Sequence, residues 1–143
     1  MGMYTEFYFN AKLKDALPDI VVDVLDTMMG HKAEMPGHLP DHPLFSCRMW
    51  EHMLRSDSFY FDSVTCSFIS DKVRRYTEKP FTELRKKVGD PWFYLNIKCN
   101  LKNYEEEIEK FIDWIRPYLD KDEGEFLGFH RYEESEEPVL VYA

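Results

Sequence analysis

The chain has 143 residues, of which 44% are hydrophobic and 16% aromatic, so one domain can form around its own core without a disulfide or a structural metal. A net charge of −9 disfavours direct binding to nucleic acid. The three cysteines are an odd number, and the sequence has no apolar run of membrane length and no signal peptide. We therefore expect a reduced, soluble protein of the cytoplasm.

The charge is unevenly distributed along the chain. Residues 48–87 contain nine Lys and Arg against six Asp and Glu, which gives +3. The rest of the chain has nine basic and 21 acidic residues, which gives −12. An acidic body therefore carries one basic segment, and the total charge does not exclude an anionic ligand.

The first predicted element is a strand over residues 3–13, where apolar and polar side chains alternate. A helix follows, with an apolar stripe at helical spacing. We expect Asp15 to be its N-cap, Pro18 to lie in its first turn and Gly30 to end it. Residues 3–30 thus form a strand–helix unit.

The middle of the chain is predicted to be irregular. Residues 31–57 are a loop-rich insertion, in which three prolines and a glycine fall within residues 31–43. Residues 44–54 fit either a short helix or an edge strand. A strand is expected over residues 58–69, followed by a basic, polar excursion over residues 72–90.

A second strand–helix unit has the clearest pattern in the sequence. Residues 92–101 alternate, and a helix follows, with Asn103 as its N-cap and Glu106 completing a capping box. The chain then closes with a hairpin, whose strands cover residues 126–132 and 139–142 around an acidic turn.

The two strand–helix units form a weak internal repeat. Four positions of the first strand recur with the same side chains 86 residues later: Phe7, Tyr8, Asn10 and Lys12 correspond to Phe93, Tyr94, Asn96 and Lys98. Two interleaved units of this kind give a βαββαβ, ferredoxin-like arrangement. We therefore predict a single α+β domain over residues 1–143, with an antiparallel sheet, two helices on one of its faces and an extra C-terminal strand.

The semi-polar face of this sheet is the first candidate binding site. If the repeated strands are neighbours, their tyrosines, amides and lysines cluster on the face that the helices do not cover. Tyr8, Trp92 and Tyr94 would stack on a base, Asn10 and Asn96 would bind its polar edges, and Lys12, Lys98, Arg74 and Arg75 would hold phosphate. The alternatives are that residues 31–57 cover this face as a second core, that it is a dimer interface, and that the two arginines lie in a solvated loop.

Metal binding and catalysis have little support in the sequence. His38 and His42 cannot form a helical HxxxH pair because Pro40 lies between them, and we expect His42 to be a cap or a loop hydrogen bonder. Cys47 beside Arg48 is a candidate nucleophile, but no general base can be assigned to it. We therefore expect no metal, no cofactor and no enzymatic activity, with a nucleotide hydrolase as the open alternative.

Three segments of the chain resemble a family of short uncharacterised proteins found in phages and bacteria: residues 39–61 (LPDHPLFSCRMWEHMLRSDSFYF), residues 95–118 (LNIKCNLKNYEEEIEKFIDWIRPY) and the C-terminal GFHRYEESEEPVLVY. The similarity extends over nearly the whole chain. It implies a phage-type counter-defence protein in the cytoplasm of a host cell.

Two functions are consistent with these features. The first is a non-catalytic protein, acting as a homo-oligomer, that sequesters a small anionic, nucleotide-like ligand. The second is an acidic inhibitor that imitates nucleic acid and blocks a host defence protein.

Overall fold

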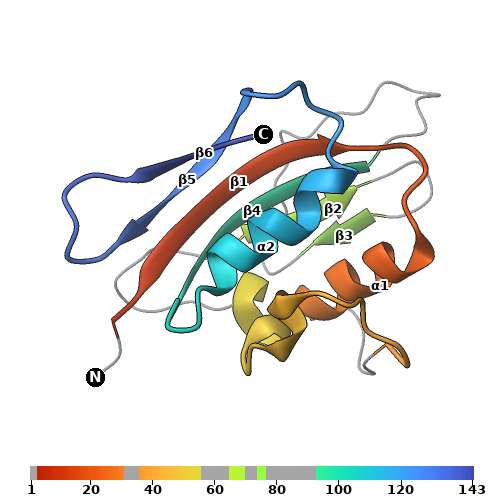
Figure 1. Cartoon of the computed structure of the whole chain (residues 1–143), viewed down its shortest axis with the longest axis horizontal. Coiled ribbons are helices and arrows are strands. Elements are labelled where there is room, and N and C mark those ends of the chain that lie inside the picture. The colour runs from red at the N-terminus through yellow and green to blue at the C-terminus, as the bar shows by residue number, and fades with distance from the viewer. Residues whose placement is uncertain (1–2, 31–35, 56–64, 70–73, 77–92) are drawn as a thin grey trace.

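The computed structural model of the protein describes residues 3–30, 36–55, 65–69, 74–76 and 93–143. These residues form an α+β fold with a six-stranded antiparallel sheet in the order β3-β2-β4-β1-β5-β6 (Figure 1). The strands are β1 (Thr5–Leu13), β2 (Thr65–Ile69), β3 (Arg74–Tyr76), β4 (Phe93–Leu101), β5 (Phe126–Tyr132) and β6 (Val139–Tyr142). The α-helices are α1 (Asp19–Met28) and α2 (Glu107–Ile115), and the 3₁₀-helices are η1 (Pro43–Ser46), η2 (Trp50–Arg55) and η3 (Arg116–Tyr118).

The two nine-residue strands β1 and β4 pair along their whole length at the centre of the sheet. Because side chains alternate along a strand, Phe7, Phe9 and Ala11 all face the core, and each is at most 1% exposed. The ring of Phe111 in α2 packs edge-on against Phe7 and Phe9, with centroid distances of 5.9 and 6.0 Å. The alternation that predicted both strands is therefore confirmed, and α2 covers the apolar face that it creates (Figure 1).

Helix α1 begins three residues later than predicted. Its N-cap position is Pro18, with φ −57° and ψ 142°, so the chain is still extended there. Asp15 consequently lies before the helix and cannot cap it. The predicted end of the helix is confirmed: Gly30 has φ 78°, which glycine adopts without strain, and its N–H donates to the Thr27 carbonyl.

Helix α2 also begins later than predicted, and the capping box is not formed. Glu106 has φ 59° and stands directly before the helix in the left-handed region. Asn103 still performs the predicted capping function from a distance, because its Oδ1 accepts a 2.9 Å hydrogen bond from the Ile108 N–H. Its Nδ2 donates to both carboxylate oxygens of Glu109, at 3.0 and 3.1 Å.

The insertion packs with the helices rather than across the other face of the sheet. Residues 43–46 and 50–55 are the 3₁₀-helices η1 and η2, so the helical interpretation of this segment is correct. The Phe45 ring lies 5.4 Å from that of Trp114 in α2, and Leu44 and Leu54 are fully buried in the same core. The alternative that residues 31–57 cover the semi-polar face is therefore not supported for the described residues 36–55.

The remaining elements agree in part with those predicted from the sequence. The C-terminal hairpin is confirmed as β5 and β6. Of the predicted strand over residues 58–69, the described part is β2. Within the basic excursion over residues 72–90, residues 74–76 form β3, a strand that the sequence analysis did not predict, and the rest lies outside the described residues. No helix in the described part of the chain is long and apolar enough to cross a membrane.

Gly128 permits β1 and β5 to approach each other closely. Its φ is 156°, and a Cβ atom placed there would lie 1.9 Å from the carbonyl oxygen of Tyr8. The register of the β5–β6 pair also shifts between Phe126 and Gly128, as at a β-bulge. A side chain at this position would have to push the two backbones apart.

We predict that Gly128→Ala lowers the free energy of unfolding by at least about 2 kcal/mol, because strained backbone and steric overlap are both introduced. Gly37→Ala is the matched control, since no atom lies within 4 Å of its added Cβ, and it should change stability by no more than about 0.5 kcal/mol. Urea denaturation measures both changes. Equal effects of the two substitutions would contradict the proposed clash.

Candidate functional site

The face of β1 and β4 opposite the helices brings together six of the nine residues predicted to bind a ligand. The strand register places Tyr8 opposite Lys98, Asn10 opposite Asn96 and Lys12 opposite Tyr94. These three cross-strand pairs are consecutive on one face, because each is two residues from the next. The 86-residue repeat thus becomes a spatial cluster, which we call the β1–β4 face.

Hydrogen bonds fix the centre of the β1–β4 face. Asn10 Nδ2 donates to Asn96 Oδ1 at 3.1 Å, and the Tyr94 hydroxyl donates to Asn10 Oδ1. Burial raises the pKa of Tyr94 more than the bond to Asn10 lowers it, so the phenol keeps its proton and remains a donor. The two amides are therefore held in one orientation.

Tyr8 already stacks on a neighbouring strand. The ring of Phe129 in β5 lies parallel to it within 16°, with the centroids 4.6 Å apart. The Lys98 ammonium lies 5.8 Å from the centroid of the Tyr8 ring, which is within the range of a cation–π interaction. Tyr8 thus contributes to a two-ring aromatic surface with a cation beside it, rather than acting as an isolated stacking platform.

Phe129 was not among the predicted site residues. The sequence placed it on a strand of the closing hairpin, but it gave no signal that this strand pairs with β1. The observed register, with Tyr8 opposite Phe129, supplies that information.

Buried amides on the β1–β4 face have unused hydrogen-bonding capacity. Asn96 is 5% exposed and Asn100 is 1% exposed. Among the described residues, Asn96 Nδ2 and both polar side-chain atoms of Asn100 have no hydrogen-bond partner. Burying such a group without a partner costs about 1–3 kcal/mol, so a ligand that satisfied these atoms would recover that energy.

Asn100 follows Lys98 in the alternation that predicted the site. It therefore belonged to the same face in the sequence pattern, although it was not selected as a site residue. The alternation does not reveal that Asn100 is buried, and it is this burial that makes an amide without a partner energetically costly. Across the strands it faces Glu6, whose carboxylate accepts a 2.7 Å hydrogen bond from Arg131 Nε.

The two lysines predicted to bind phosphate, Lys12 and Lys98, differ in their electrostatic environment. Lys12 Nζ lies 3.1 Å from Asp120 Oδ2, and both side chains are about half exposed, at 42% and 53%. No acidic partner of Lys98 occurs in the described part of the chain. Lys98 is therefore better placed than Lys12 to attract an anion.

The other three predicted residues are not brought into this cluster by the described structure. Arg74 and Arg75 lie in β3, where they pair with Ile69 and Phe68 of β2, and β2 separates β3 from β4. Trp92 lies outside the described residues. A contribution from these three side chains remains a prediction.

Cys47 does not have the environment of an activated nucleophile. It is 4% exposed, and burial raises the pKa of its thiol, an effect that the nearby Lys110 only partly offsets. Lys110 Nζ lies 3.6 Å from Cys47 Sγ. The thiol therefore keeps its proton at neutral pH, and activation by the adjacent Arg48 is not supported.

His42 has the capping function that the sequence predicted. Its Nδ1 accepts a hydrogen bond from the Leu44 N–H at the start of η1. The proton of a neutral ring must then be on Nε2, which lies 2.8 Å from Asp113 Oδ2 and donates to it. In the described part of the chain, no group of three or more His, Cys, Asp or Glu residues has the geometry of a metal site.

The helix side of the sheet contains a cavity of about 290 Å³ that the sequence did not predict. The residues that characterise it come from the start of α2 and from the β5–β6 hairpin: Asn103, Tyr104, Glu109, His130, Tyr132 and Glu137. They are widely separated in the sequence and share no short motif. Only the tertiary structure brings them together.

His130 is the titratable group most affected by burial in this cavity. Burial lowers its pKa below 6.5, and the Glu109 carboxylate, 3.9 Å away, partly offsets this effect. Just below pH 6.5 the unfolded chain therefore binds more protons at this position than the folded chain. Stability conferred by a neutral His130 is consequently lost as the pH falls through this range.

We predict that the free energy of unfolding decreases less steeply between pH 7.5 and pH 5.5 in His130→Gln than in the parent protein. Urea denaturation at several pH values measures the slope. His38→Gln, which removes a histidine from an exposed site, is the control and should keep the parent slope. Identical slopes for all three proteins would show that His130 makes no such contribution.

Comparison of the chain with protein-family models, curated proteins and solved structures gives no match. Inferences about function therefore depend on the geometry described above.

Proposed function

We propose that this protein is a non-catalytic binding protein that sequesters a small anionic, nucleotide-like ligand on its β1–β4 face. The observation that carries the proposal is the pair of buried amides, Asn96 and Asn100, whose donors and acceptor have no partner among the described residues and lie beside Lys98 on one face. Unpartnered buried amides are costly in the absence of a ligand and give specificity in its presence.

The chemistry of this face suits a nucleobase that carries phosphate. The amide groups can bind the polar edge of a base, since an amide offers both donors and an acceptor. The Tyr8–Phe129 pair adds aromatic surface, and stacking on such surfaces contributes about 1–3 kcal/mol per base. Lys98 supplies positive charge, and the arginines of β3 could bind a second phosphate.

We infer sequestration rather than turnover. The raised pKa of Cys47 argues against it as the nucleophile. The Glu6 carboxylate, which lies opposite Asn100 on the β1–β4 face, already accepts a hydrogen bond from Arg131. A bound ligand should therefore be recovered intact when the protein is denatured, whereas a hydrolase would release products.

The resemblance to short phage and bacterial proteins supports a biological role for such binding. A phage protein that removes a signalling nucleotide in the host cytoplasm would silence the defence that depends on it. A homo-oligomer would place several copies of the β1–β4 face in one particle and increase retention.

We further infer that the core of the fold is a ferredoxin-like βαββαβ unit. The sheet order β2-β4-β1-β5 with antiparallel neighbours supports this arrangement. Helix α1 follows β1 and helix α2 follows β4 in the chain. In this view β6 is the predicted extra C-terminal strand at one edge of the sheet, and β3 extends the opposite edge.

We predict that protein purified from its natural host carries a small molecule that heat releases intact, detected by native mass spectrometry before and after heating. The Asn100→Leu variant should retain at least tenfold less of this molecule than the parent protein. It should be at least as stable as the parent, because a buried amide with no partner among the described residues is replaced by an apolar side chain of similar size. Lys98→Ala and Arg74→Ala/Arg75→Ala should also reduce retention.

Lys14→Ala is the matched control for charge, since Lys14 is exposed just beyond the end of β1. It should retain the ligand at the parent level. If Asn100→Leu and Lys98→Ala both retain the ligand as well as Lys14→Ala does, the β1–β4 face is not the binding site. If the released molecule is always a cleaved product, the protein is a hydrolase.

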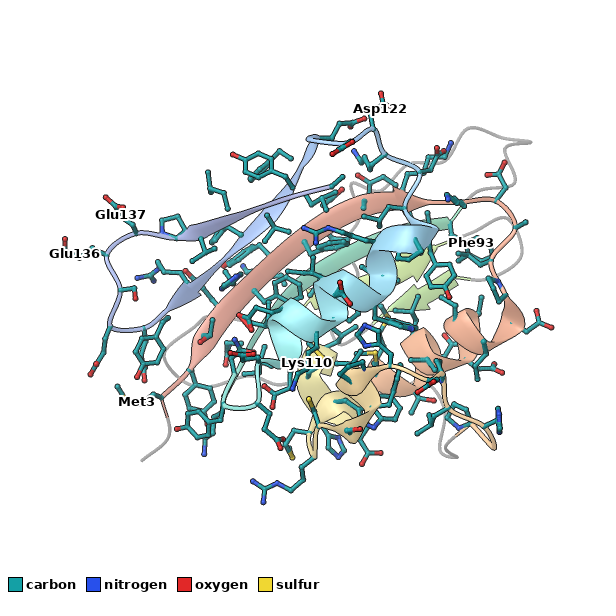
Figure 2. The ribbon with its side chains drawn as sticks, viewed as in Figure 1. Met3, Phe93, Lys110, Asp122, Glu136 and Glu137 are labelled. Carbon is teal, nitrogen blue, oxygen red and sulfur yellow. The ribbon has the colours of Figure 1, made fainter. Side chains whose placement is uncertain are left out.

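The acidic hairpin supports a second function, inhibition of a host defence protein that binds nucleic acid. Glu136 and Glu137 lie at the outer end of the β5–β6 hairpin (Figure 2), and both are exposed. Glu134 lies in the same turn and is also exposed. Closely spaced carboxylates of this kind can imitate a phosphate backbone.

For this second function we predict an effect of the triple substitution Glu134→Gln, Glu136→Gln and Glu137→Gln. It should weaken inhibition of the defence protein, and it should make the remaining inhibition less sensitive to salt concentration. Glu133 should be left intact, because its Oε1 accepts a hydrogen bond from the Tyr4 N–H and helps to hold β1. An assay of the inhibited nuclease at several salt concentrations tests this prediction. Full inhibition by the triple variant would show that the hairpin is not the inhibitory surface.

A further inference from the structure

The cavity on the helix side of the sheet lies on the opposite face from the proposed nucleotide site. His130 and Tyr132 of β5 pair with Phe7 and Thr5 of β1, and Phe7 faces the helical core. The cavity is therefore bounded by the beginning of β1, the beginning of α2 and the terminal hairpin. Figure 2 shows Met3 and Glu137, which both line it, at the same end of the molecule.

The charge of the cavity is negative. Two carboxylates, Glu109 and Glu137, line it, and no lysine or arginine is among its described lining residues. The histidine of the cavity, His130, resists protonation because it is partly buried. The positive end of α2 is offset by Glu107 and Glu109, which both lie in the first turn of the helix.

Two tyrosines give the same cavity aromatic walls. Tyr104 is 65% exposed, but its hydroxyl is anchored by a 3.0 Å hydrogen bond from the Met3 N–H. Tyr132 projects from β5, and partial removal from water raises the pKa of its phenol, with a further contribution from the nearby charges of Glu134 and Glu133. The ring faces of both tyrosines attract cations.

The principal carboxylate is held in position before any ligand arrives. Asn103 Nδ2 donates to both oxygens of Glu109, and Asn103 is itself fixed by the N–H of Ile108. A preorganised charge loses less side-chain entropy on binding than a mobile one. Glu109 is thus a fixed negative charge that lines the cavity together with the two tyrosines and lies 3.9 Å from His130.

We propose that this cavity binds a small organic ammonium ion, with Glu109 opposing its charge and Tyr104 and Tyr132 contacting its alkyl groups. Carboxylates combined with aromatic ring faces select alkylated ammonium ions, because such ions are weakly hydrated and fit against π surfaces. An inorganic cation instead requires several converging oxygen ligands, an arrangement that is not found among the described residues.

Titration with tetramethylammonium chloride, followed by ¹H–¹⁵N NMR at constant ionic strength, tests this proposal. We expect saturable shifts in residues that surround the cavity, and no saturable shifts there with sodium chloride. Glu109→Gln and Tyr104→Leu should each weaken binding at least fivefold. Tyr104→Phe, which keeps the ring but loses the hydroxyl, should bind within about twofold of the parent protein.

Glu123→Gln is the matched control, because it removes the same charge from an exposed turn. It should bind tetramethylammonium as the parent does. Equal weakening by Glu109→Gln and Glu123→Gln would show a general charge effect and overturn the proposal, as would the absence of saturable shifts in the folded parent. Asn100→Leu, which alters the opposite face, should leave this binding unchanged whatever its effect on the nucleotide site.

Discussion

The antiparallel pairing of β1 with β4 is the constraint on which the rest of the structure depends. One register, which runs from Thr5 opposite Leu101 to Leu13 opposite Phe93, determines both faces of the sheet. A shift by one residue would move every side chain to the other face. The phenylalanines beneath α2 would then meet solvent, and the amides and lysines would enter the core. The stability of the helical layer and the composition of the β1–β4 face therefore have the same origin.

The polar side chains on the two sides of the sheet can be compared by their hydrogen bonds. On the helix side, polar groups near the start of α2 satisfy one another: Asn103 bonds both the helix backbone and Glu109. On the other side, Asn10 is satisfied by Asn96 and Tyr94, but Asn100 has no partner in the described structure. Native proteins rarely leave such groups without a partner unless function requires it. Asn96 Nδ2 and both polar side-chain atoms of Asn100 lie on one face of β4 without a partner among the described residues, which is why the β1–β4 face is the stronger candidate for a specific ligand.

The sequence predicted those features that depend on local periodicity. The alternation in residues 92–101 located β4, the 86-residue repeat located its partner, and the turn around the acidic run located the last hairpin. The starts of both helices were missed because backbone conformation decided them: an extended Pro18 and a left-handed Glu106. Phe129 and the cavity were missed because they depend on which strands are neighbours, and that information is not local.

The terminal strand β6 has a consequence for the behaviour of the molecule in concentrated solution. It is the last strand of the described sheet, and Val139, Leu140 and Tyr142 on it are each close to half exposed. Such an edge can recruit a strand from another molecule, and proteins usually guard it with charge, proline or shortness. This edge has all three protections, since β6 has only four residues and Glu136, Glu137 and Pro138 precede it. The acidic turn thus also opposes the pairing of this edge with a strand of another molecule.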